Sequence, residues 1–162
     1  CSSDLPGGSH SRTLGPFADD VVSPDTSLWH WSYNRGKKSV VLDLDTADDR
    51  DKLLALIDGA DIVIEAYGPG VLDTLGLSYE VMSERNPALI HLSISAFGDE
   101  GPKALWEATD LTIMASGGQM SLAGDLDRAP VRIPLDQAYL HVSSEAVGAA
   151  LIALYERQHN SG

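Results

Sequence analysis

Few residues in this chain combine the types and the spacing that chemistry needs. The 162-residue sequence contains no G-x-S-x-G nucleophile elbow, no P-loop and no G-x-G-x-x-G dinucleotide motif. His141 and Glu145 stand four positions apart, which puts them on one helix face and would let them ligate a metal, although a solvated or structural pair is the commoner arrangement. The five histidines do not otherwise pair at metal-ligand spacing, so the sequence predicts no metal site.

Three other groups have a possible binding role beside a plain structural one. The acidic residues between 43 and 51 could surround a cation, but helix capping accounts for most of them. Trp29 and Trp31 alternate with His30 in a segment that could be extended; they could stack on an adenine or a partner subunit, or pack in a core. The turn at 68–70, Gly-Pro-Gly, could let the backbone approach a ligand or could be only a turn.

Alternating strand and helix patterns must position these residues. Short apolar runs predict three strands, at 39–44, 61–67 and 88–97. Helical patterns predict a helix from Thr46 to about Gly59, short helices at about 70–75, 79–85 and 109–116, and a long helix over about 138–157. Such alternation predicts a parallel α/β sheet, whose ligands bind at the carboxyl ends of the strands, here around 43–45, 66–70 and 95–98.

Composition narrows the classes of function. With 11 Lys and Arg against 24 Asp and Glu, the formal net charge is −13, which argues against nucleic-acid partners and against docking on anionic membranes. No apolar run approaches about 20 residues, so we expect no transmembrane helix. The single cysteine, Cys1, excludes an internal disulfide framework and favours a cytoplasmic setting. Because the sequence lacks an initiator Met and a signal peptide, we also expect an internal fragment of a longer protein.

An ordered set of short motifs carries a family resemblance. The set runs Asn34–Leu44, Ala60–Glu65, Gly68–Leu72, Leu75–Tyr79, Asn86–Ile90, Ser93–Gly98, Gly101-Pro102, Asp110-Leu111 and Pro130–Arg132. In order and spacing it resembles the family III CoA-transferases of the CaiB/BaiF type, from about residue 12 to residue 157. The resemblance implies a Rossmann-like α/β fold with flanking helices, incomplete here because the first β-α-β unit and the C-terminal part are missing, in subunits that form interlocked dimers. Within one fragment of the large domain we expect an irregular lead-in (1–38), an α/β core (39–136) and the long helix (138–158).

The resemblance also implies a reaction. Family members move CoA between carboxylic acids through an aspartate that attacks the acyl-CoA and forms anhydride and aspartyl-thioester intermediates. Acyl-CoA and a carboxylic acid would be the substrates, and no cofactor would be permanently bound. In the family the aspartate follows the Arg of the Pro-Val-Arg motif by seven residues, and counting from Arg132 gives Tyr139. Counting back from Arg157 gives the same position. The nearest carboxylate is Asp136, which is the candidate nucleophile or a helix N-cap.

The family's contacts with the CoA phosphates are also altered. Three positions where the resemblance expects cations carry Asp45, Thr74 and Glu107, and acids there would repel a polyanionic ligand. What remains of the CoA site is its apolar and backbone part. This part comprises Leu42, Ala66, Tyr67, Gly68 and Leu75.

Three hypotheses follow. The chain is an acyl-CoA:carboxylate CoA-transferase with its nucleophile at Asp136 or outside these residues. Alternatively it is a catalytically degenerate half or subunit that serves as scaffold for an active partner. The segment Gln137–His141 favours the second, because it resembles a branch of the family in which unlike subunits pair. The third hypothesis is a CoA-independent α/β binding module. The partner would be a second copy in a homodimer or an unlike family III subunit.

Overall fold

The computed structural model describes residues 2–4 and 8–159, and Cys1 lies outside them. The chain divides into two compact units, Cys1–Ala55 and Leu56–Gly162. The described strands form two parallel sheets of two strands each, one in each unit. The fold class is therefore mixed α/β with small parallel sheets and flanking helices, which agrees with the sequence in its class and in its parallel pairing.

The first unit joins two short strands to a helical lead-in. Strand β1 (Ser2–Asp4) pairs in parallel with β2 (Ser39–Val41), and helix α2 (Ala47–Ile57) begins in this unit. Between the strands lie η1 (His10–Thr13), η2 (Ala18–Asp20) and α1 (Leu28–Tyr33). The expectation of an extended Trp29–Trp31 segment is wrong, since both residues lie in α1. The cause is Ser27, which is fully buried and whose Oγ accepts a hydrogen bond from the backbone N–H of His30, so that it caps the helix.

Local contacts account for part of the acidic run after β2. The Asp49 carboxylate accepts a hydrogen bond from the Asp43 backbone N–H at 2.8 Å and pairs with Lys52 at 2.8 Å. The hydrogen bond from Lys52, followed by the one from the Asp43 backbone, lowers the pKa of Asp49. Among the described residues, no group of three or more His, Cys, Asp or Glu is arranged to hold a metal ion.

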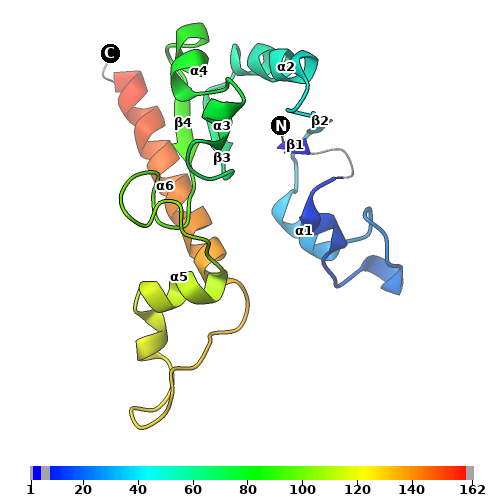
Figure 1. Ribbon diagram of the computed structural model, residues 1–162. Helices are drawn as coiled ribbons and strands as arrows, with labels where there is room; N and C mark the ends of the chain where they lie inside the picture. The colour runs from blue at the N-terminus through cyan, green and yellow to red at the C-terminus, as the bar shows by residue number, and fades with distance from the viewer. Residues whose placement is uncertain (1, 5–7, 160–162) are drawn as a thin grey trace. The chain divides into compact units, whose positions relative to one another are not determined.

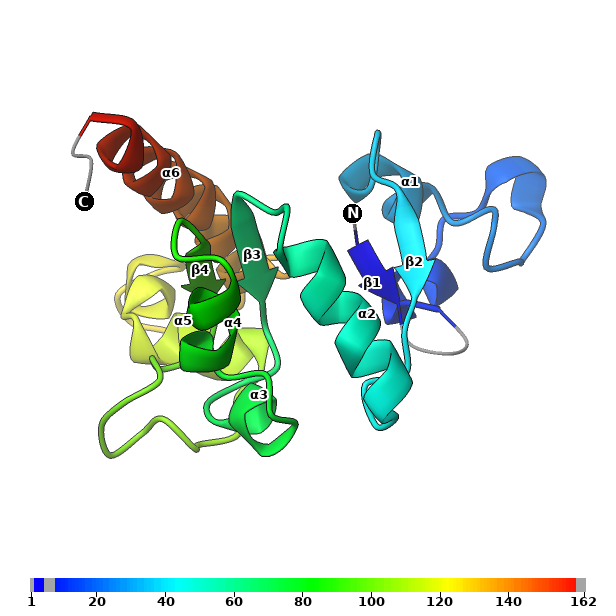
Figure 2. The ribbon, with the colours of Figure 1, turned by 90° about the horizontal axis from the view of Figure 1, so that it is seen from above.

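The second unit is built around strands β3 (Ile62–Glu65) and β4 (Ile90–Ser93), which pair in parallel with Glu65 opposite Ser93. Helices α3 (Val71–Thr74) and α4 (Tyr79–Arg85) form the crossover between them. After β4 come α5 (Asp110–Ser116), η3 (Gln119–Leu122) and α6 (Gln137–His159). Figures 1 and 2 show α3 and α4 on one face of this sheet and α6 on the other.

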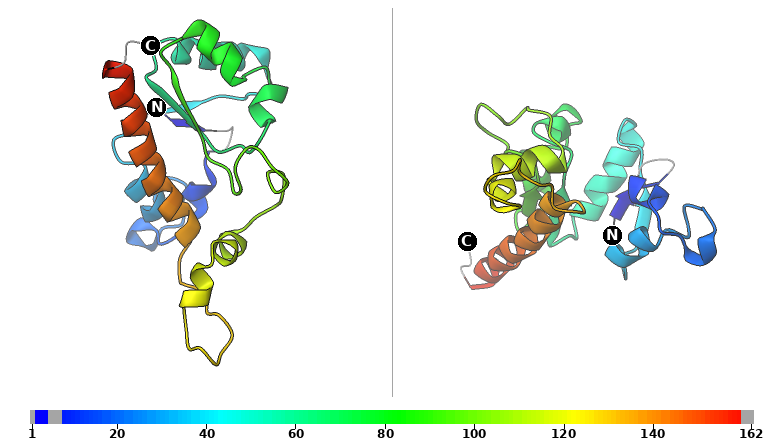
Figure 3. Two further views of the ribbon diagram at one scale, coloured as in Figure 1. Left: turned by 90° about the vertical axis from the view of Figure 1, so that its left-hand side faces the viewer. Right: turned by 90° about the horizontal axis from the view of Figure 1, so that it is seen from below.

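The core of the second unit lies under the crossover helices. Ile57, Leu77, Met82 and Leu89 are almost completely buried. The Asn86 side chain, at the end of α4, donates hydrogen bonds to the carbonyls of Ile57 (3.0 Å) and Ala60 (2.8 Å). At the far end of α6, Arg157 donates to the Ala88 carbonyl (2.7 Å) and the Asp61 carboxylate (2.6 Å). These contacts fasten the helix to the beginning of both strands, as Figure 3 shows for its course beside β4.

Helix α6 departs from one expectation. Among the described helices it alone is long and apolar enough to cross a membrane, judged by length and composition only. A search for continuous apolar runs does not find this helix, because Ser143, Ser144 and Glu145 interrupt its apolar residues. The same helix packs against α5 and β4 and is anchored by Arg157, while Val147, Leu151, Ile152 and Tyr155 on it are 58% to 64% exposed. By itself one such helix is weak grounds for a membrane partner.

Candidate functional site

The turn after β3 is the centre of the candidate site. Gly68 (φ 92°) and Gly70 (φ 75°) both adopt left-handed backbone conformations that favour glycine, and α3 begins immediately afterwards. The backbone N–H of Tyr67 donates to the Glu65 carboxylate at 2.8 Å, which secures the turn at the end of the strand. The chain thus turns sharply at the carboxyl end of β3, where parallel sheets bind their ligands.

One cavity of about 340 Å³ opens on the α6 side of this turn. We call it the uncharged cavity, because none of its lining residues carries a formal charge. Its walls come from the ends of β3 and β4, the loop before α5, and the first turns of α6. The lining includes Ala66, Tyr67, Gly68, Ile94, Trp106 and Tyr139.

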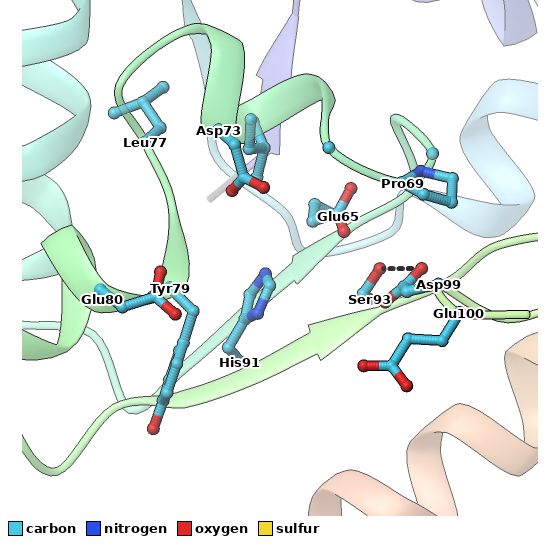
Figure 4. Close-up of a pocket in the computed structure, with 13 residues that line it drawn as sticks. Glu65, Pro69, Asp73, Leu77, Tyr79, Glu80, His91, Ser93, Asp99 and Glu100 are labelled. Atoms are coloured by element: carbon cyan, nitrogen blue, oxygen red, sulfur yellow. Dashed lines mark hydrogen bonds between the residues drawn. The ribbon is translucent and has the colours of Figure 1, made fainter. Parts of the chain in front are cut away.

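A second cavity, of about 450 Å³, lies on the α4 side and shares Gly68 and Pro69 with the first. We call it the acidic cavity, because five carboxylates line it and no Lys or Arg does. Figure 4 shows these carboxylates around the His91 imidazole, which belongs to β4. The five are Glu65, Asp73, Glu80, Asp99 and Glu100.

Aromatic and polar contacts organise the acidic cavity. The His91 ring stacks on Tyr79 with centroids 5.8 Å apart, and its Nε2 is buried without a hydrogen-bond partner among the described residues. Ser93 Oγ donates to the Asp99 carboxylate at 3.2 Å. A hydrogen bond from the Ser78 hydroxyl, followed by one from its own backbone N–H, lowers the pKa of Glu80. The cavity is therefore anionic at neutral pH.

The first turn of α6 brings Tyr139 to the uncharged cavity. The Asp110 side chain, only 5% exposed at the start of α5, accepts a hydrogen bond from the Ala138 backbone N–H at 2.7 Å. Its other carboxylate oxygen, Oδ2, accepts no hydrogen bond from any described residue, and Arg132 Nη2 lies 3.6 Å from it, close enough for an ion pair only. The Asp110 carboxylate thus lies at the N-terminus of α6. There a carboxylate accepts a hydrogen bond from an N–H that has no partner within the helix, and the helix dipole stabilises its negative charge.

Asp136 lies immediately before α6. Its carboxylate accepts a hydrogen bond from Arg132 at 3.3 Å, and its backbone carbonyl accepts one from Leu140 at 3.2 Å. The backbone carbonyl of Asp136 thus accepts a helical hydrogen bond at the start of α6. The N–H of Ala138 in the same turn is bound by the carboxylate of Asp110. Asp136 is about half exposed and does not line the uncharged cavity. Its role as nucleophile stays a prediction.

The residues expected to contact CoA are brought together only in part. Ala66, Tyr67 and Gly68 line the uncharged cavity. Leu75 is partly buried at the end of α3 and lines neither cavity, and Leu42 is buried in the other unit. The three positions where the resemblance expects cations, Asp45, Thr74 and Glu107, are all exposed.

Two features of the site were missing from the sequence analysis. Trp106 was overlooked, although the Gly101-Pro102 motif had placed a loop beside it, and the acidic cavity was not foreseen at all. The tentative pair His141 and Glu145 is exposed on α6, with no hydrogen bond or ion pair between the two described side chains.

A parallel sheet with flanking helices, with a glycine turn and a cavity at its carboxyl end, places the second unit in the mixed α/β class. The sequence profile of CoA-transferase family III matches residues 4–162, so the chain belongs to that family, and the resemblance found in the motifs is confirmed. The chain is 38% identical over 155 residues to the succinyl-CoA:(R)-benzylsuccinate CoA-transferase subunit BbsE of Thauera aromatica, covering 96% of this chain and 38% of that protein. It is 40% identical over 126 residues to the acetyl-CoA:oxalate CoA-transferase of Acetobacter aceti, covering 78% and 31%.

Solved structures agree with this assignment. A CAIB/BAIF family protein from Brucella suis superposes with a TM-score of 0.89 at 35% identity, covering 98% of this chain and 42% of that one. The orthorhombic form of Rv3272 from Mycobacterium tuberculosis gives a TM-score of 0.82 at 33% identity, covering 98% and 44%. This chain therefore spans less than half the length of each relative.

Proposed function

We propose that this chain is a non-nucleophilic subunit or half of a family III CoA-transferase. A second family III chain or half would supply the carboxylate nucleophile, and the assembly would move CoA between an acyl-CoA and a carboxylic acid. The observation that carries the proposal is Tyr139, which stands where the family has its aspartate and lines a cavity without any carboxylate.

The chemistry of the transfer explains why this substitution matters. The carboxylate attacks the thioester carbonyl and expels the CoA thiolate, which leaves a mixed anhydride; the thiolate then attacks the enzyme's side of that anhydride and releases the first acid. A phenol must first lose its proton to a base before it can attack. The residues that line the uncharged cavity include no His, Asp, Glu or Lys to take that proton. Tyr139 is thus poorly placed to replace the aspartate.

Charge supports the same proposal. The three cations expected to hold the CoA phosphates are replaced by Asp45, Thr74 and Glu107, and five carboxylates line the neighbouring acidic cavity. Like charges of this kind disfavour a polyanion at close range. The relative from Thauera aromatica is itself named as a subunit, which agrees with division of roles between chains.

A second candidate keeps the chemistry within this chain, with Asp136 as the nucleophile. Its half-exposed carboxylate is the nearest in sequence to Tyr139 and accepts a hydrogen bond of 3.3 Å from Arg132. Against it, a shift of three residues at a helix start moves a side chain by several ångströms, and small displacements of a nucleophile are costly.

The two candidates predict different results in the full-length protein. Purified through a tag, it should bring down a second family III chain, and transfer should survive Tyr139→Phe and Asp136→Asn within about twofold. Asp125→Asn is the matched control, because Asp125 also forms an exposed pair with a neighbouring arginine, Arg128. Replacing the partner's nucleophilic carboxylate should abolish transfer.

Other outcomes would reassign the function. A homodimer that transfers CoA alone, and loses about a hundredfold or more with Asp136→Asn but not with Asp125→Asn, would overturn the proposal in favour of Asp136. Absence of both a family III partner and any response to CoA would favour the CoA-independent module.

A further inference from the structure

A serine and a histidine of the first unit form a hydrogen-bonded pair that the proposed function does not use. Ser11 Oγ, in η1, lies 2.7 Å from His30 Nδ1, in α1. Both residues are partly exposed, so that the pair is open to molecules in solution. A hydroxyl within hydrogen-bond reach of an imidazole is the arrangement in which a histidine removes the proton of a nucleophilic serine.

Asn34 determines which ring nitrogen of His30 carries the proton. Lys37 Nζ donates to Asn34 Oδ1 at 3.0 Å, and the amide nitrogen of Asn34, Nδ2, donates to the His30 carbonyl at 3.0 Å. These two hydrogen bonds fix the orientation of the amide. The same Nδ2 lies 3.2 Å from His30 Nδ1, and because an amide nitrogen only donates, Nδ1 is the acceptor. The neutral imidazole therefore carries its proton on Nε2.

The direction of the hydrogen bond between Ser11 and His30 follows from this tautomer. Because His30 Nδ1 has no proton, the Ser11 hydroxyl donates to it, over the shorter of the two distances at that nitrogen. The Ser9 hydroxyl lies 2.9 Å from Ser11 Oγ and donates to it, since the Ser11 proton is directed at the imidazole. A hydroxyl oxygen has two lone pairs, and no other described residue donates to Ser11 Oγ. One lone pair is therefore available to attack an electrophile.

Ser27 holds the two segments together. It is fully buried, and its Oγ accepts a hydrogen bond from the His30 backbone N–H at 3.1 Å. The same hydroxyl donates to the Leu14 carbonyl at 2.6 Å and lies 3.0 Å from the Ser11 carbonyl oxygen. One buried side chain thus connects the backbone of η1 to the start of α1. Reacting groups held in place in this way lose little entropy on reaching the transition state.

We propose that Ser11 is a nucleophile that accepts an acyl group from an activated carboxylic ester, with His30 as its base. Ser11 Oγ attacks the ester carbonyl carbon while its proton moves to His30 Nδ1. The C–O bond to the leaving group then breaks, the leaving group takes the proton from His30, and an acyl-serine remains. His30 next removes a proton from water, which attacks the acyl-serine, releases the acid and restores the Ser11 hydroxyl. No step of the proposed CoA transfer uses either residue.

The test treats the full-length protein with p-nitrophenyl acetate. Absorbance follows the release of p-nitrophenol, and mass spectrometry of acid-quenched samples locates the acetyl group. We expect acetylated Ser11 and p-nitrophenol release that depends on it. Ser11→Ala should remove this reaction, and His30→Gln should slow acetylation of Ser11 at least about a hundredfold, because a glutamine can bind the hydroxyl but cannot take its proton.

Ser32→Ala is the matched control. Ser32 lies on the same helix as His30, but its hydroxyl donates to the Leu28 carbonyl, at 2.8 Å, and not to an imidazole. This variant should react as the wild type does. Circular dichroism of each variant checks the fold, and His30→Gln keeps the inference testable if Ser11→Ala unfolds.

Asn34→Asp tests the positioning role of the amide. A carboxylate accepts where the amide donates, so the imidazole proton should move to Nδ1, which nitrogen NMR of His30 detects. Acetylation of Ser11 should then slow about tenfold while the circular dichroism stays unchanged. A purely structural role of Asn34 would not move the imidazole proton.

The inference fails if Ser11→Ala and His30→Gln release p-nitrophenol as fast as the wild type, or if acetyl groups appear on other residues and not on Ser11. Such a result would leave the proposed function standing wherever a family III partner is found and CoA is transferred. A protein that acetylates Ser11 but has no family III partner would keep this inference and overturn the proposed function.

Discussion

The two cavities beside Gly68 and Pro69 share a turn and a pair of strands, yet carboxylates line one of them and uncharged residues line the other. Side chains alternate between the faces of a strand, so Glu65, His91 and Ser93 meet on the α4 face and line the acidic cavity. Ile94 and Ala96 line the uncharged cavity with the first turns of α6. The pairing register of β3 and β4 therefore keeps the acidic and the uncharged side chains apart. A substitution that affects one cavity should leave the other largely intact.

Asp110→Ala should have the largest effect, and it should act on the uncharged cavity alone. The variant loses the hydrogen bond to the Ala138 N–H and leaves Arg132 without its buried partner, which should reduce the free energy of unfolding by about 2–3 kcal/mol. Urea unfolding measures the loss.

Asp136→Ala is the control for this variant. Its carboxylate is exposed and pairs with the same arginine, so the expected change is within about 0.5 kcal/mol. Equal losses in the two variants would mean that Arg132, and not the capping of α6, carries the effect.

Introducing cations at the three positions where the resemblance expects them would show whether the present side chains there weaken CoA binding. The triple variant carries Asp45→Lys, Thr74→Arg and Glu107→Lys. Because cations attract the phosphates of CoA, we expect CoA to bind at least about tenfold more tightly in low salt, a gain of about 1.4 kcal/mol. Calorimetry of the full-length protein measures it.

A second triple variant separates specific contacts from net charge. It makes the same change in formal charge on an exposed loop, with Asp125→Lys, Ser121→Arg and Asp127→Lys. CoA affinity that rises equally in both variants would point to long-range attraction only, and the three positions would then have no special place in a CoA site.

Gly68→Ala tests the turn that the cavities share. A Cβ at Gly68 would meet no atom within 4 Å, so the cost comes from its φ of 92° alone. We expect a loss of about 1 kcal/mol in stability and weaker ligand binding. Gly148→Ala in α6 also has free space but lacks the positive φ, and it should stabilise the protein by up to about 1 kcal/mol. A neutral Gly68→Ala variant would show that the left-handed turn is dispensable.

Much of the fold could be predicted because it rests on local signals. The long helix, α2 and α4 were expected within a few residues, since their caps and apolar spacing are written in consecutive positions; Ser78 caps α4 as a serine there suggests. The strands are shorter than the sequence predicts. The apolar run 88–97 contains only the strand Ile90–Ser93, because the pairing with β3 ends at Glu65 opposite Ser93. Parallel pairing followed from the alternation of elements.

The site was harder to predict because its members meet only in three dimensions. Tyr139 was located by counting along a family pattern, which needs no structure. Asp110 and Ala138 are 28 residues apart. No local pattern in either segment predicts that the Asp110 carboxylate caps α6. The acidic cavity depends likewise on Glu65 and Ser93 facing each other across two strands. Such contacts arise from tertiary packing, which periodicity and composition do not contain.

Glu80→Gln should give the smallest effect, and it examines the acidic cavity through its pH dependence. Hydrogen bonding in the folded state lowers the pKa of Glu80, so folding favours its ionised form. That contribution is present above the unfolded pKa, about 4.3, and is lost as the pH falls through the lower folded value. Glu80→Gln should therefore lower Tm slightly at pH 7 and not at pH 3. Glu84→Gln, on the same helix, is the matched variant for the loss of one glutamate charge. A decrease in Tm that persists at pH 3 would instead assign the role of Glu80 to packing and not to charge.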